Sequence, residues 1–206
     1  MRIQLRGPIQ AALIIGALQL LPSVAPTVAQ ATPSVPPSTA PERDGQHDFD
    51  FAMGSWKIHL ARLDHPLTGS KNWIQFDGTL RAHKIWDGRA NVEEVELNSP
   101  TGPIEGLTVR FYNPQSHQWA IYWANAKNAS VDPIPQIGQF KNGRGEFYGQ
   151  DTLNGKLIYV RYVWTKTDTH SPHFEQSYSN DGGKTWEVNW MTDQTRVDDT
   201  AAPAAH

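Results

Sequence analysis

The sequence predicts an all-β protein: an antiparallel up-and-down meander of about ten strands that closes into a barrel. Three observations support this. Apolar and aromatic residues recur at every second position over most of the region 47–196, as they do in strands with one buried face. Turn dipeptides interrupt these segments at short intervals, which is typical of hairpins. No segment keeps a helical period for longer than about ten residues.

The expected strands share one pattern, in which buried-type residues alternate with others. In chain order the alternating sets are Trp56, Ile58 and Leu60; Leu107, Val109 and Phe111; Trp119, Ile121 and Trp123; Ile158, Val160, Tyr162 and Trp164; Phe174, Gln176 and Tyr178; and Trp186, Val188 and Trp190. The turn signals are Asp87-Gly88, Asn113-Pro114, Asn142-Gly143, Asn154-Gly155 and Asp181-Gly182. The one helix-like segment is a short turn near 49–53. Because the connections are short and local, a closed barrel is favoured over a sandwich, and closure also removes exposed strand edges.

The first 31 residues have the layout of a secretory signal peptide. Arg2 and Arg6 supply a basic start, an apolar stretch runs from Ile9 to Leu21, and Ala29-Gln30-Ala31 offers a small-x-small cleavage site. The apolar stretch is shorter than the ~20 residues that span a bilayer comfortably. We therefore expect cleavage, a periplasmic or secreted product, and no stable membrane insertion afterwards.

Composition narrows the class further. The chain has no cysteine, so disulfides, thiolate nucleophiles and cysteine metal sites are excluded. Cleavage would remove two arginines and no acid, which leaves 16 basic against 21 acidic residues and a net charge of −5. This balance argues against nucleic acid or an anionic membrane as the partner.

Both ends of the expected mature chain are poor in apolar residues. Residues 32–46 are rich in Pro, Ser and Thr, and 197–206 are similar, so we expect a disordered tether and a disordered tail. The folded domain is expected over 47–196.

Five segments resemble a bacterial secreted family of unknown function with a lipocalin-like (calycin) β-barrel. They are residues 48–70 (DFDFAMGSWKIHLARLDHPLTGS), 84–94 (KIWDGRANVEE), 104–119 (IEGLTVRFYNPQSHQW), 138–148 (GQFKNGRGEFY) and 174–190 (FEQSYSNDGGKTWEVNW). The resemblance implies a lipocalin-like fold and an exported protein. It implies no catalytic residue.

Residues 179–186 (SNDGGKTW) match the Asp-box pattern S-x-D-x-G-x-T-W. Its physical role is a hairpin turn in which the Asp side chain binds turn amides and glycines supply positive φ angles. A glycosidase would need repeated copies on a larger propeller. We therefore expect this motif to stabilise a turn.

A ligand site is expected inside the barrel, because eight tryptophans are many for this length and barrels of this size can enclose a ligand. Trp123 and Trp190 are the candidates for its lining. The alternative is that the tryptophans only fill the core, and alternation does not distinguish the two.

Four polar residues lie opposite the apolar faces of their strands: Arg110, Arg161, Glu175 and Asn189. If the apolar faces line the barrel, these four are ordinary exterior residues. If they are buried, an Arg161–Glu175 cross-strand pair is the simplest structural arrangement. In a wider barrel they would converge inside as further ligand-binding residues, because a buried charge needs a partner.

The sequence predicts no metal or cofactor. His170 and His173, and the group His47, Asp48 and Asp50, lack the further spaced ligands of a specific site. No nucleophile elbow, HExxH motif or phosphate loop is present. The carboxylates of Glu93, Glu94 and Glu96 are expected on a solvated strand, where neighbours face opposite ways.

Three functions remain open from sequence. The leading hypothesis is an exported binding protein that holds a small, mostly apolar or planar molecule in an aromatic-lined cavity. The second is a small enzyme that uses a cluster of Arg110, Arg161 and Glu175. The third is a ligand-free structural or interaction module with a filled core.

Overall fold

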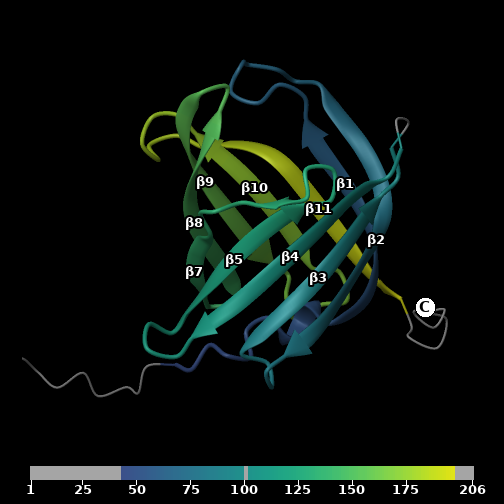
Figure 1. Ribbon diagram of the computed structural model, residues 1–206, viewed down its shortest axis with the longest axis vertical. Helices are drawn as coiled ribbons and strands as arrows, with labels where there is room; N and C mark the ends of the chain where they lie inside the picture. Colours follow the sequence, from purple (N-terminus) through teal and green to yellow (C-terminus); the bar gives the residue numbers. More distant parts are fainter. Residues whose placement is uncertain (1–42, 100–101, 198–206) are drawn as a thin grey trace, which may run out of the picture. The chain divides into compact units, whose positions relative to one another are not determined.

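The computed structural model describes residues 43–99 and 102–197, which form an all-β barrel (Figure 1). The expected signal peptide and most of the expected tether and tail lie outside these residues. The elements are η1 (Asp50–Ala52), β1 (Gly54–Leu63), β2 (Trp73–Ile85), β3 (Ala90–Leu97), β4 (Ile104–Asn113), β5 (Gln118–Asn125), β6 (Ser130–Val131), β7 (Gln136–Lys141), β8 (Arg144–Leu153), β9 (Lys156–Thr165), β10 (His173–Ser179) and β11 (Glu187–Val197). No helix among the described residues is both long enough and apolar enough to cross a membrane.

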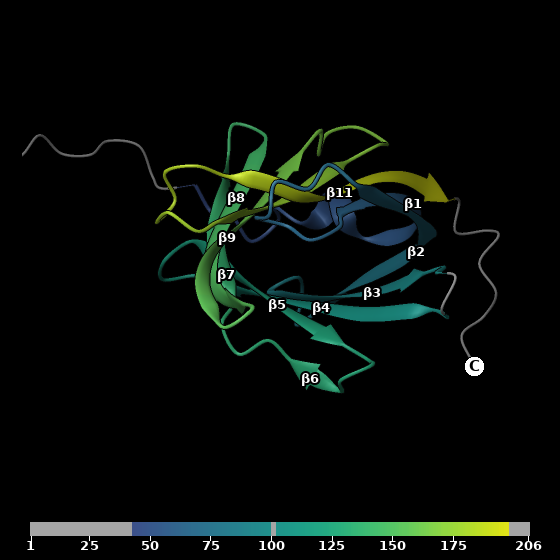
Figure 2. The same ribbon diagram turned by 90° about the horizontal axis from the view of Figure 1, so that it is seen from above.

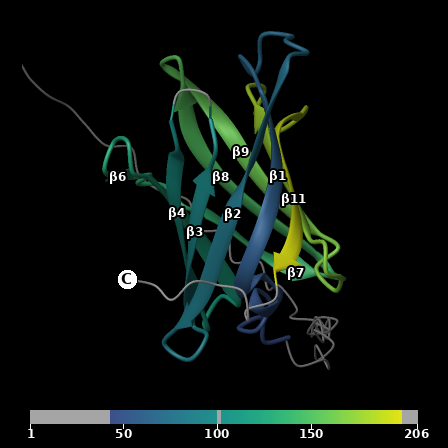
Figure 3. The same cartoon turned by 90° about the vertical axis from the view of Figure 1, so that its right-hand side faces the viewer.

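Ten strands close the barrel in an up-and-down meander, which confirms the predicted fold class. Each strand pairs antiparallel with its neighbour in sequence, except that β5 pairs with β7, and β11 closes the circle against β1. The two-residue strand β6 is a branch on β5 and projects from the wall in Figure 2. The strands are strongly tilted in the side view of Figure 3, as closure of a barrel requires.

The predicted Asn-Gly turns form two tight hairpins. Asn142 and Gly143 join β7 to β8, and Asn154 and Gly155 join β8 to β9, all four with positive φ angles between 52° and 76°. Two consecutive positive φ angles match the twist of the flanking strands. The sequence thereby specifies the register of β8.

One end of the barrel is filled by aromatic side chains around η1, which confirms the short helical turn expected near 49–53. The Phe49 ring packs edge-on against Trp119 and Trp164, with centroids 5.2 and 5.3 Å apart. Trp119 donates from Nε1 to the backbone oxygen of Gly45 at 2.9 Å, so ordered structure begins before the expected domain start at 47. Such edge-on pairs stabilise beyond the area they bury.

Strand β4 is oriented opposite to its apolar alternation. Thr108 and Arg110 are buried inside, whereas Leu107 and Val109 are only half-buried and Phe111 is 37% exposed on the outer face. Phe111 contacts the exposed ring of Trp86 on that face. The expectation that residues 107, 109 and 111 mark the buried face is therefore wrong for this strand.

The barrel wall is incomplete between β5 and β8. Strand β7 pairs with β5 over only three residues, ending at Gln136 opposite Ile121. Residues 149–153, the last part of β8, therefore pair with β9 alone. The loop 132–135 lies at this point and contributes to the cavity lining.

Candidate functional site

The interior that η1 and its aromatic neighbours leave free is a cavity of about 580 Å³. This volume lies within the range of ~300–1,000 Å³ typical of small-molecule sites. The lining includes Asp64, Asp132 and Thr152, which are solvent-exposed or half-buried and lie at the barrel end away from η1. That end is therefore the mouth of the cavity.

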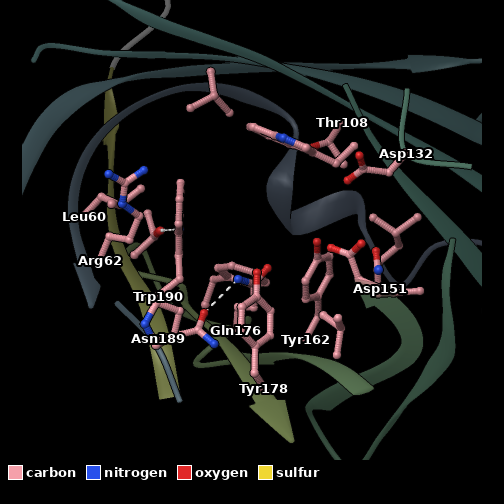
Figure 4. A pocket seen from close by; sticks show the side chains of 18 of the residues that line it. Leu60, Arg62, Thr108, Asp132, Asp151, Tyr162, Gln176, Tyr178, Asn189 and Trp190 are labelled. Atoms are coloured by element: carbon pink, nitrogen blue, oxygen red, sulfur yellow. Dashed lines mark hydrogen bonds between the residues drawn. The ribbon is translucent and has the colours of Figure 1, made fainter. Parts of the chain in front are cut away.

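Aromatic residues from both sides of the barrel line the cavity. Trp123 comes from β5, Tyr162 from β9, Tyr178 from β10 and Trp190 from β11. In Figure 4 the side chains of Tyr162 and Trp190 stand on opposite sides of the space. The lining therefore combines large apolar faces with hydroxyl and indole N–H groups.

Trp123 lies against the backbone because residue 106 is a glycine. A Cβ atom built on Gly106 would lie 2.0 Å from Cη2 of Trp123. Any side chain at this position would displace the indole. Gly106 thus sets where one aromatic wall of the cavity stands.

A β-bulge turns two consecutive residues of β11 inward. The register between β10 and β11 shifts after Gln176, which pairs with Trp190, while Ser177 pairs with Val188. Two residues on the bulged strand then oppose one on its partner. Asn189 and Trp190 both line the cavity as a result, although simple alternation places them on opposite faces.

A buried ion pair lies in the cavity wall. Arg110, 1% exposed, donates from Nη2 to Oε2 of Glu93 at 2.6 Å and from Nη1 to Oδ1 of Asn91 at 2.9 Å. The guanidinium also lies over the rings of Phe49 and Trp164, 4.7 and 5.7 Å from their centroids. Glu93 therefore neutralises Arg110, and aromatic faces hold it in place.

Amide and hydroxyl groups complete the polar lining. Gln176 donates from Nε2 to Oδ1 of Asn189 at 2.8 Å. Three buried atoms of lining residues lack a hydrogen-bond partner: Nε of Arg110, Nδ2 of Asn189 and Oε1 of Gln194. Burial raises the pKa of Tyr178 to about 12 and also raises that of Tyr162, so both phenols are neutral donors at physiological pH.

The structure brings together four of the six predicted ligand-binding residues. Trp123, Trp190, Arg110 and Asn189 line the cavity. The other two, Arg161 and Glu175, are not among the lining residues and lie on the outer face.

The outer-face residues have partners there. Arg161 lies over the ring of Trp186, 4.7 Å from its centroid, and donates to Ser177 at 3.5 Å. Glu175 contacts Nε2 of His173 at 3.1 Å. The cluster of Arg110, Arg161 and Glu175 proposed for an enzyme is therefore not assembled.

Sequence reasoning missed Glu93, Asp132 and Asp151. Glu93 is 7% exposed, so the expectation of a solvated strand is wrong for this residue, although Glu94 and Glu96 are exposed. Arg110 could have indicated the position of Glu93, because a buried arginine needs a carboxylate partner nearby, here on the adjacent strand. Nothing in the local sequence points to Asp132 or Asp151, because only the fold brings the loop 132–135 and β8 to the same side of the cavity.

No group of three or more His, Asp or Glu side chains among the described residues is arranged to hold a metal ion.

No protein-family model matches the sequence, and no curated protein does. Thirteen chains of solved structures resemble the fold. One is the S-type phycobiliprotein lyase CPES from Guillardia theta, with a TM-score of 0.53 and 10% identity, covering 76% of this chain and 94% of that chain. At this identity the likeness shows the fold alone. It supports the lipocalin-like barrel, while membership of the secreted family stays a prediction.

Proposed function

We propose that this protein is an exported binding protein that holds one small, largely apolar or planar molecule in its barrel. The observation that carries the proposal is the cavity of about 580 Å³ lined by Trp123, Tyr162 and Trp190. Sites of this kind bury most of an apolar ligand and orient it with a few polar groups. The basic start, apolar stretch and cleavage motif of residues 1–31 support export.

The alternatives have less support. A ligand-free module with a filled core would not leave a cavity of this size. The solved structure with a similar fold is described as a phycobiliprotein lyase. This likeness is compatible with a small-molecule site in the present barrel, but it does not identify the ligand.

The test uses the neutral fluorescent probe N-phenyl-1-naphthylamine, titrated into the purified protein. We expect saturable binding at one site with quenching of tryptophan emission. Trp123→Ala and Trp190→Ala should each weaken binding by about tenfold, as truncation of a central aromatic contact does. Trp86→Ala is the matched control, because Trp86 is 63% exposed and does not line the cavity.

Gly106→Ala tests the same site without removing an aromatic group. The new Cβ must push the Trp123 indole away from the backbone, so we expect weaker binding of the probe with the fold retained. Leu107→Ala, one residue along β4 on the outer face, should leave affinity unchanged. Absence of saturable binding in a folded protein, shown by circular dichroism, would contradict the proposed function.

A further inference from the structure

Acidic side chains outnumber basic ones among the charged residues that line the cavity. Glu93 and Arg110 neutralise each other. Near the mouth, the carboxylate of Asp64 lies 2.9 Å from Nδ1 of His65. Once these pairs are set aside, the charged residues left in the lining are Arg62, Asp132 and Asp151.

The two remaining carboxylates lie together, away from the remaining arginine. Asp132 belongs to the loop before β7, and Asp151 follows Phe147 and Gly149 on the inward face of β8. Figure 4 shows them on the same side of the cavity as Tyr162, with Arg62 and Trp190 on the opposite side. Arg62 itself lies over the ring of Phe76, 5.4 Å from its centroid.

Neither carboxylate has a basic partner among the residues that the structure describes. Asp151 accepts a hydrogen bond from the backbone N–H of Thr152 at 2.6 Å. Partial burial, together with the charge on Asp151, raises the pKa of Asp132. Two like charges at the edge of an apolar cavity repel each other, and a cation between them would remove that repulsion.

Some groups of the lining suit a positive charge or a hydrogen-bond donor, although Nε of Arg110 and Nδ2 of Asn189 are themselves donors without a partner. The hydroxyl of Tyr162 has no hydrogen-bond partner within the described chain. The acceptor Oε1 of Gln194, a lining residue that is 5% exposed, also lacks one. Indole and phenol faces attract cations through their negative π surfaces. Such faces are supplied by Trp123, whose backbone oxygen accepts from the N–H of Asp132 at 2.8 Å, and by Tyr162, which lies beside Asp151 in Figure 4.

We propose that the ligand is an organic cation: an apolar or planar body that carries one protonated amine or quaternary ammonium group, held between Asp132 and Asp151. This inference rests on the proposed binding function and adds the chemical class of the ligand. The apolar body lies between the aromatic walls, and the charged end faces the mouth. An anionic amphiphile would instead direct its head group to Arg62. The two ligand classes therefore depend on different residues of the site.

Three probes of equal chain length separate the binding function from the ligand class. Decyltrimethylammonium, decanol and decanoate are titrated at pH 7, below the micellar concentrations of the two ionic probes and the solubility limit of decanol. Affinity is followed by tryptophan fluorescence and calorimetry. We expect all three to enter the cavity and the cation to bind about five- to tenfold more tightly than the alcohol, given the usual strength of cation–π and exposed ionic contacts. Decanoate should be the weakest.

Charge-neutralising variants identify the residues responsible. Asp132→Asn/Asp151→Asn should reduce the affinity for the cation to that for decanol and leave decanol unchanged. Glu94→Gln/Glu96→Gln removes the same charge from the outer face and should preserve the preference. Lowering the pH through the raised pKa of Asp132 should weaken binding of the cation alone.

The other possible results of these titrations contradict either the organic-cation proposal or the binding function. Equal affinity for the cation and decanol, or a preference that survives Asp132→Asn/Asp151→Asn, would overturn the organic-cation proposal and leave the binding function standing. Tightest binding of decanoate, lost in Arg62→Gln, would replace it with an anionic ligand. Failure of all three probes to bind a folded protein would overturn the binding function and the ligand class together.

Discussion

At the scale of single residues, Asp181 organises the turn between β10 and β11. Its carboxylate accepts hydrogen bonds from the backbone N–H groups of Lys184 and Thr185, both at 3.0 Å. The hydroxyls of Ser179 and Thr185 donate to it at 2.7 and 2.6 Å. These bonds lower the pKa of Asp181, with the Thr185 hydroxyl as the largest cause.

Asp181→Ala should lower the melting temperature at pH 7 and leave probe affinity per folded molecule unchanged. A carboxyl whose pKa is depressed on folding stabilises the native state above its unfolded pKa and loses that contribution as pH falls towards the folded pKa. The difference from wild type should therefore shrink below the ordinary value of 3.8. Thermal melts at pH 7 and pH 3 measure this, with Asn180→Ala as the control in the same turn. Equal melting temperatures at pH 7 would show that the turn does not depend on Asp181.

Tryptophans that look alike in sequence have different roles in the structure. Trp56 is 1% exposed and donates from Nε1 to the backbone oxygen of Ala52 at 2.9 Å, so it belongs to the core. Trp123 lines the cavity. Both alternate with neighbours on an inward strand face. The difference arises because η1 fills one end of the barrel and leaves the other end open.

At the scale of elements, β3 and β4 are joined by a buried ion pair as well as by their backbone ladder. Glu93 and Arg110 lie on adjacent strands of the interior face, where each charge is taken out of water. Removal of one partner from such a pair leaves an uncompensated buried charge. The stability of this part of the wall therefore depends on both residues.

Arg110→Met should destabilise the protein by about 3–5 kcal/mol, the usual cost of breaking a buried pair from one side. Arg110→Met/Glu93→Gln should recover much of the loss, because no charge then remains buried. Urea unfolding followed by far-UV circular dichroism gives both values, and Arg81→Met on the exposed face of β2 is the control. A double variant no more stable than the single one would show that the guanidinium's packing on Phe49 and Trp164 matters more than charge.

At the scale of the whole molecule, strand number and closure explain why a cavity exists. A closed meander of ten strands encloses more space than about eight strands do, and side chains alone then no longer fill the interior. Here the aromatic cluster around η1 fills the closed end. The cavity occupies the rest, and loop 132–135 bounds it where β7 does not reach.

Export is a prediction for the whole chain that does not depend on the barrel. The signal layout of residues 1–31 predicts that the mature protein begins at Thr32 or close to it and accumulates outside the inner membrane. N-terminal sequencing of the protein from its host, with cell fractionation, measures both. An intact Met1 on a membrane-bound product would contradict it.

The sequence alone was sufficient to predict the strands, the hairpins and the closed meander, because alternation and Asn-Gly turns are local properties of the chain. It also led to Trp123 and Trp190 as candidates for the lining. Which face of each strand lines the cavity depends on packing between distant segments. The polar face of β4 turns inward because Arg110 finds Glu93 on β3 and aromatic rings beneath it. The bulge at Asn189 and the placement of Asp132 and Asp151 on one side of the cavity likewise arise from strand pairing and closure, which no local pattern encodes.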